Sequence, residues 1–126
     1  MAGYQAFVKA SCDVCHIPHH TTGASSLPGL SYVTYFPYSD FQIHDMGKGL
    51  ADGIPQGEAS GSQFRTAPLW GLGQRIFFLH DGRTTDLLQA ILAHDSPQSE
   101  GGGSVSAFNS LTNKEKQDLL NFLRSL

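Results

Sequence analysis

Apolar side chains recur at helical spacing close to the N-terminus. Tyr4, Phe7 and Val8 occupy positions i, i+3 and i+4, so they share one face of a helix. This pattern predicts a short helix over Tyr4–Ala10. The helix leads directly into a pair of cysteines, Cys12 and Cys15.

Two further helices are predicted in the C-terminal third, each after a capping signal. Asp86 and Gln89 have the spacing of a capping box, and so do Thr112 and Glu115. The first helix is expected to end near His94 and the second to reach the C-terminus. Apolar positions at helical spacing follow each box: Leu87, Leu88, Ile91 and Leu92 after the first, and Leu119, Leu120, Phe122, Leu123 and Leu126 after the second.

The remaining stretches have no periodic apolar pattern. Residues 17–37 and 38–61 are rich in glycine, proline, serine and threonine and are expected to be irregular. Residues 65–73 hold one candidate short helix beginning near Pro68, and the Gly-Gly-Gly-Ser run at 101–104 is expected to be a flexible connection. No stretch alternates long enough to indicate a sheet, so the pattern predicts an all-α fold.

Length and charge limit the classes of protein to which the chain can belong. A chain of 126 residues fits a single domain spanning residues 1–126. The net charge of −3 offers no basic face, so no nucleic-acid partner is expected. No apolar run approaches the roughly 20 residues that cross a bilayer, so we expect no membrane span.

The strongest chemical signal is Cys12-Asp13-Val14-Cys15-His16, which has the pattern of a c-type haem attachment sequence. Each thiol can bond one vinyl group of a porphyrin, and His16 then reaches the iron. The motif predicts one covalent haem c, and with it a class I cytochrome c-like domain whose long loops pack on the porphyrin. Because such attachment normally happens outside the cytoplasm, we expect a periplasmic or otherwise extracytoplasmic protein whose export signal is already removed.

Two other uses of the cysteines are weaker. A zinc site would take Cys12 and Cys15 with two nearby histidines, but zinc ligand pairs are usually a dozen or so residues apart. A thioredoxin-like dithiol would need a βαβ context, which the pattern lacks.

The spacing of the residues does not by itself identify the second axial ligand of the iron. Met46 is attractive because a thioether is a common sixth ligand in electron carriers. His94 is attractive because the end of a helix supports it rigidly. His44 and His80 are further candidates, and His19 and His20 lie too close to His16 in the chain to reach the other face of the iron without strain.

Three other side chains are candidates for contact with the porphyrin. Arg83 and Arg65 each carry a guanidinium that suits a bidentate contact with a haem propionate. Trp70 can donate its indole N–H to a propionate or pack on the ring edge. The alternatives are solvent-exposed ion pairs for the arginines and a core position for Trp70.

Four segments in the same order resemble the C-terminal haem domain of the dihaem oxidoreductases once called thiol oxidoreductases, which are related to dihaem cytochrome c peroxidases and MauG-type enzymes. They are Cys-Asp-Val-Cys-His-Ile-Pro (12–18), Tyr-Ser-Asp-Phe-Gln-Ile-His-Asp-Met-Gly-Lys-Gly-Leu-Ala-Asp-Gly (38–53), Phe-Arg-Thr-Ala-Pro-Leu-Trp-Gly-Leu-Gly (64–73) and Phe-Leu-His-Asp-Gly-Arg (78–83).

The resemblance implies an iron held by His16 and His94. In that superfamily the second ligand follows the histidine of the His-Asp-Gly motif by fourteen residues, which here leads from His80 to His94. Two imidazoles close both axial positions, so the resemblance implies electron transfer, with a redox protein or a second haem domain as partner. The alternative is the haem domain of a peroxidase-like dihaem oxidoreductase, with catalysis at the second haem.

Overall fold

Five α-helices and two small antiparallel sheets make up the fold, and the computed structural model describes residues 1–126. The helices are α1 (Ala2–Lys9), α2 (Gly47–Leu50), α3 (Leu87–Leu92), α4 (Gly102–Asn109) and α5 (Asn113–Arg124). The strands are β1 (His20–Thr21), β2 (Thr34–Tyr35), β3 (Ile43–Asp45) and β4 (Gln63–Arg65), and β1 pairs with β2 and β3 with β4.

The expectation of an all-α, class I cytochrome c-like fold is therefore wrong, because the architecture mixes helices with strands. The strands are only two or three residues long, so none contains enough positions for an alternating pattern to show. They form because the backbone groups of long loops need hydrogen-bond partners, and the opposite loop supplies them.

The helices expected from local signals are present. The N-terminal helix lies over Ala2–Lys9, and α3 ends at Leu92, two residues before His94. The capping box of α5 is complete, since Thr112 accepts from the backbone N–H of Glu115 and the Glu115 side chain accepts from that of Thr112. Asp86 caps α3 by accepting from the N–H of Leu88 at 2.8 Å, without the expected reciprocal bond from Gln89.

Helix α4 begins where the sequence predicted a flexible connection, and that prediction is wrong. Glycine disfavours helix by roughly 1 kcal/mol per residue relative to alanine, so the run at 101–104 gives no local helical signal. Val105 and Phe108, one turn apart on α4, are both buried. Their burial against the rest of the core stabilises a helix that its own sequence does not favour. The short helix expected near Pro68 is a 3-10 turn at Leu72–Gln74.

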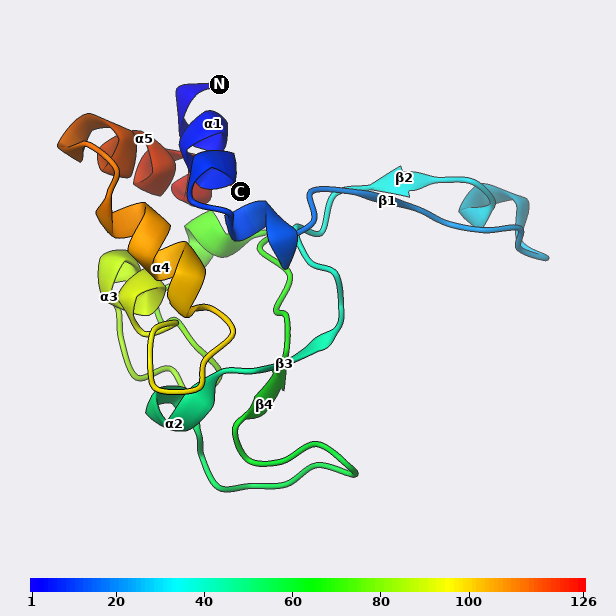
Figure 1. Ribbon diagram of the computed structural model, residues 1–126. Helices are drawn as coiled ribbons and strands as arrows, with labels where there is room; N and C mark the ends of the chain where they lie inside the picture. The colour runs from blue at the N-terminus through cyan, green and yellow to red at the C-terminus, as the bar shows by residue number, and fades with distance from the viewer.

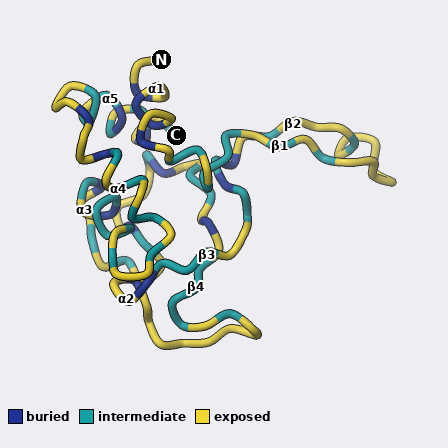
Figure 2. Tube along the Cα trace, in the orientation of Figure 1, coloured by how far each residue is buried: buried dark blue, intermediate teal, exposed yellow.

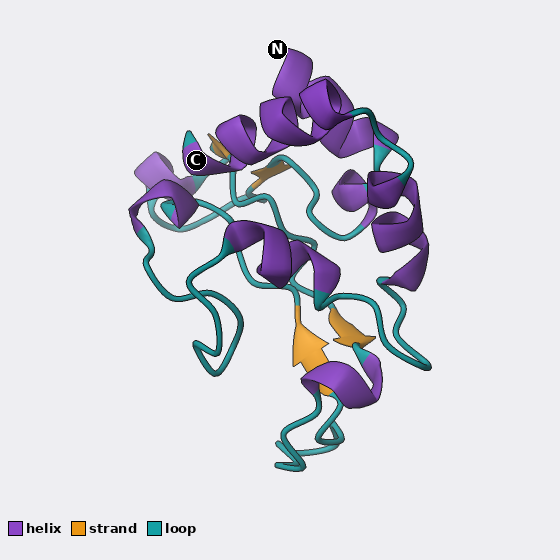
Figure 3. Cartoon of the chain, turned by 90° about the vertical axis from the view of Figure 1, so that its left-hand side faces the viewer, coloured by secondary structure: helices purple, strands orange, loops and turns teal.

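The core forms where α1 crosses α5. Phe7, Phe108 and Leu119 are its largest fully buried side chains. Gly3 lies directly against the backbone of Asp118 on α5, so any larger side chain at position 3 would separate the two helices. In Figure 3 most helices lie in the upper part of the molecule, and the β3–β4 sheet lies below them next to a short helix.

Residues 17–37 form an arm that leaves the body of the protein, with β1 and β2 as its two sides (Figure 1). Its base is pinned by backbone bonds from Ser39 N–H to the carbonyl of Ile17 at 2.9 Å and from Asp40 N–H to that of Cys15 at 2.8 Å. Figure 2 shows that most of the arm is exposed. No helix of the protein has the length and apolar character that crossing a membrane requires.

Candidate haem-binding site

A partly open cavity of about 480 Å³ borders the core, between the cysteine motif, the β3–β4 region and the helices α3, α4 and α5. Nine buried hydrophobic residues line it: Phe7, Leu50, Leu72, Phe78, Leu87, Ala90, Val105, Leu119 and Leu123. Protein interiors are close-packed, with few voids larger than a water molecule. A mostly apolar cavity of this size therefore fits a large apolar group rather than solvent.

The two cysteines enter the cavity from a 3-10 turn at Cys12–Val14, which directly follows α1. The turn continues into His16, whose N–H donates to the carbonyl of Cys12 at 2.9 Å. Both thiols are free. Burial, followed by the charges of Asp13 and Cys15, raises the pKa of Cys12 to about 12. A dithiol redox centre depends on a lowered thiol pKa, so this environment does not favour one.

The ligands of the alternative zinc site are not brought together. The metal-binding side chains whose donor atoms lie within 4.8 Å of one another are Cys15, Asp40 and His44. His20 instead bonds to the backbone at the base of the arm, through Nε2 and the carbonyl of Ser39 at 2.7 Å. His19 also lies on the arm, with its ring against Phe36.

His16 and His94 both line the cavity, and a backbone carbonyl holds each ring in the same way. Nδ1 of His16 lies 2.9 Å from the carbonyl oxygen of Tyr38, and Nδ1 of His94 lies 2.8 Å from that of Ala90. A carbonyl oxygen can only accept, so Nδ1 carries the proton and Nε2 is left available in each ring. Metal-binding histidines are usually oriented by such a bond from the second ring nitrogen.

The electrostatic environment keeps His16 neutral. Burial lowers the pKa of His16 to about 4, against the opposing effect of its bond to Tyr38, and His94 contributes to the lowering. A neutral imidazole is the form that binds a metal.

The other proposed axial ligands differ in whether their donor atoms already have partners. Both ring nitrogens of His44 are occupied, at 2.8 Å from Asp40 and 2.7 Å from Glu100. His80 lines the cavity but stacks on Phe64, with ring centroids 4.3 Å apart. Met46 lines the cavity and no polar contact engages its thioether, so it stays an alternative ligand.

Only some of the residues predicted to contact the propionates line the cavity. Arg65 lines it, and so does Arg75, which the sequence did not single out. Arg83 instead donates to Asp81 and to the carbonyl of Gly49, both at 2.7 Å, and does not line the cavity. Trp70 is 51% exposed and lies near Tyr35 at the base of the arm.

An apolar cavity with two thiols and two oriented imidazoles has the donor set of a haem-binding protein. Residues 1–126 match the family described as "di-haem oxidoreductase, putative peroxidase". The chain therefore belongs to the di-haem oxidoreductase family, which confirms the resemblance seen in its motifs. No curated protein and no solved structure matches the sequence.

Proposed function

We propose that this chain carries one haem c bonded to Cys12 and Cys15, with His16 and His94 as axial ligands, and that it transfers electrons. The observation that carries the proposal is that two imidazoles line one cavity, each with Nδ1 held by a carbonyl and Nε2 available. The apolar lining and the family membership support the same cofactor.

Different residues of the chain hold different parts of the proposed haem. Cys12 and Cys15 anchor its edge, and the core side chains around the cavity exclude water from its faces. Arg65 and Arg75 are the cations placed to pair with propionates. When bound, the haem supplies a one-electron ferric/ferrous couple. Ligation by His16 and His94 holds the reduction potential lower than ligation by His16 and Met46 would.

The electron partner is proposed to be a redox protein or a second haem domain. The family is a di-haem one, whereas this chain contains a single Cys-x-x-Cys-His motif and no other cysteine. Covalent attachment of the haem supports an extracytoplasmic location, and the periplasm is the location we propose.

A second candidate function is participation in a peroxidase, which the family description favours. In that case the reaction takes place at a second haem and this chain supplies electrons to it. The isolated chain has one Cys-x-x-Cys-His motif, so peroxide turnover is measured with the chain alone and again after a second haem domain is added. Reversible one-electron cycling with negligible turnover in both cases supports the carrier, and turnover only after the addition supports participation in a peroxidase. Turnover by the chain alone would instead indicate a catalytic iron in this chain.

The proposal is tested on protein produced with haem attachment and export. Mass spectrometry is expected to show the polypeptide plus one haem, and the oxidised spectrum is expected to be low-spin. His94→Ala removes an axial ligand and is expected to give a high-spin spectrum, while Met46→Ala, which changes a neighbouring cavity residue, keeps the low-spin one. A bare polypeptide mass would overturn the haem itself, and a spin change in Met46→Ala alone would overturn the ligand assignment.

A further inference from the structure

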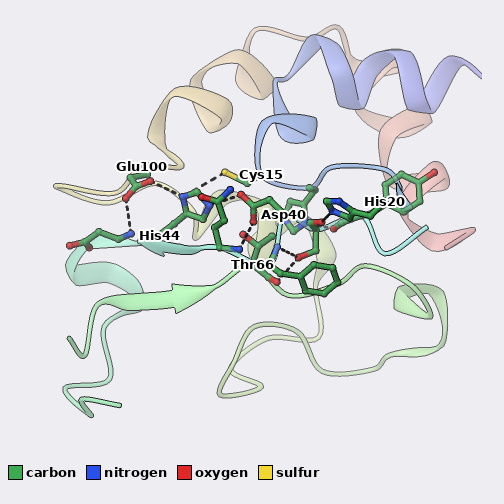
Figure 4. Close-up of polar contacts among 12 residues, drawn as sticks. Cys15, His20, Asp40, His44, Thr66 and Glu100 are labelled. Carbon is green, nitrogen blue, oxygen red and sulfur yellow. Dashed lines mark hydrogen bonds and ion pairs between the residues drawn. The ribbon is translucent and has the colours of Figure 1, made fainter. Parts of the chain in front are cut away.

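A charged cluster lies beside Cys15 and includes none of the proposed haem ligands. The imidazole of His44 sits between two carboxylates, with Nε2 2.8 Å from Asp40 and Nδ1 2.7 Å from Glu100 (Figure 4). His44 Nδ1 also lies 4.0 Å from the sulfur of Cys15. We call Asp40, His44 and Glu100 the carboxylate–imidazole triad.

The hydrogen bonds determine the charge of the triad. An ionised carboxylate only accepts, so both ring nitrogens of His44 must donate and the ring is an imidazolium. Burial raises the pKa of Asp40, but the N–H of Gln42 and the ring of His44 outweigh it and leave that pKa below its ordinary value. The N–H of Asp45 and the ring of His44 likewise lower the pKa of Glu100. Two carboxylates and one imidazolium together carry a net charge of −1.

Backbone bonds hold this charge in place. Asp40 accepts from the N–H of Gln42 at 2.9 Å, and its own N–H donates to the carbonyl of Cys15. Glu100 accepts from the N–H of Asp45 at 2.9 Å and donates its own N–H to the carbonyl of Asp45. The triad thus joins the base of the arm, β3 and the segment before α4, and it cannot move away from the cysteine.

The solvent screens the triad only partly. The side chain of Asp40 is 4% exposed and that of His44 is 17% exposed, whereas Glu100 is 54% exposed at the outer end. His44 and Glu100 both line the cavity. Charges that are partly buried keep more of their effect on a neighbouring redox centre than charges surrounded by water.

We propose that the carboxylate–imidazole triad is a fixed negative charge that sets the reduction potential of the haem, a role that rests on the proposed function above. A ferric haem carries one more positive charge than a ferrous haem. A fixed negative charge at the Cys15 edge therefore stabilises the ferric form and lowers the potential. His44 is a positioning residue, since it binds both carboxylates and offsets half of their charge.

Single substitutions change the charge of the triad in opposite directions. Glu100→Gln and Asp40→Asn each remove one negative charge, so the triad becomes neutral and the potential rises. His44→Gln removes the positive charge, so the triad carries −2 and the potential falls. If the triad only held the neighbouring segments together, every substitution would loosen them and admit water to the haem. All the variants would then shift the potential in the same direction.

The experiment measures reduction potentials by spectroelectrochemistry at pH 6, where both carboxylates stay ionised and His44, whose two carboxylate partners raise its pKa above that of a free imidazole, stays positively charged. The low-spin spectrum is recorded first, to verify that haem and ligands are in place. Glu58→Gln is the matched control, because it removes the same charge from an exposed residue for which no ion pair is seen. We expect a higher potential in Glu100→Gln, a lower one in His44→Gln and no change in Glu58→Gln.

Shifts of the same sign in Glu100→Gln and His44→Gln, or no shift in either, would overturn the role of the triad while leaving the haem assignment intact. A wild-type protein without covalent haem would instead overturn the proposed function. Asp40→Asn alters the most buried member of the triad and therefore also affects folding, so the decision rests on the other two variants. Raising the ionic strength should reduce the shift in Glu100→Gln, since Glu100 is the exposed end.

Discussion

A methyl group at position 101 would press on the backbone of His94. A Cβ on Gly101 would lie 2.8 Å from the carbonyl oxygen of His94, 3.1 Å from its Cβ and 3.4 Å from the terminal methyl of Met46. Gly101 has a φ of −78°, which alanine adopts without strain, so the contact alone decides the effect of Gly101→Ala. The carbonyl of His94 also accepts from Ser99 Oγ at 2.6 Å, and displacing it disturbs that bond.

The size of the effect follows from two opposing contributions. Overpacking of this kind costs about 1–3 kcal/mol. Replacing glycine by alanine restricts the unfolded chain, which raises the free energy of unfolding by about 0.4–1 kcal/mol. We therefore expect Gly101→Ala to lower the free energy of unfolding by about 1–2 kcal/mol. We also expect it to perturb the low-spin spectrum, because the helix end that carries His94 must shift.

Gly103→Ala is the matched control. Position 103 lies two residues further along, inside α4, and a Cβ there would meet nothing within 4 Å. The change should raise the free energy of unfolding by about 0.5–1 kcal/mol and leave the spectrum unaltered. Thermal unfolding followed by circular dichroism compares the two variants. Equal stability and identical spectra would refute the view that residue 101 supports His94.

Two further predictions concern parts of the fold away from the ligands. Gly3→Ala should separate α1 from α5 at Asp118 and cost about 1–3 kcal/mol in a urea titration; a variant as stable as the wild type would contradict the close crossing. Replacing residues 22–33 of the arm by a short turn should leave the absorption spectrum of the haem unchanged, because no residue between 17 and 43 lines the cavity. A loss of haem from that variant would show that the arm contributes to the site.

Local signals along the chain were sufficient for several parts of this protein. The two cysteines and His16 lie within one turn, so their spacing alone indicates the attachment chemistry. The cap at Asp86 acts over two residues and the box at Thr112 over three, and each marks the start of a helix. Such features are visible in the sequence because the interacting groups are neighbours in the chain.

The features that the sequence did not indicate depend on contacts between distant segments. Strands of two or three residues exist only through their partners, and α4 exists because Val105 and Phe108 are buried. Both ring nitrogens of His44 are occupied because Glu100, fifty-six residues away, reaches one of them. Nothing in the local sequence distinguishes Arg75, which lines the cavity, from Arg83, which does not.

The sequence by itself thus determined the Cys-x-x-Cys-His motif, the starts of α3 and α5 and the family, because these depend on short-range spacing and residue type. The tertiary structure decided which imidazoles share the cavity, which cations lie beside it and where the triad is placed. These depend on how the loops pack around the core, and a chain has many ways to bring distant loops together. Packing selects one of them, since only that arrangement buries the apolar faces and satisfies the backbone groups of the loops at the same time.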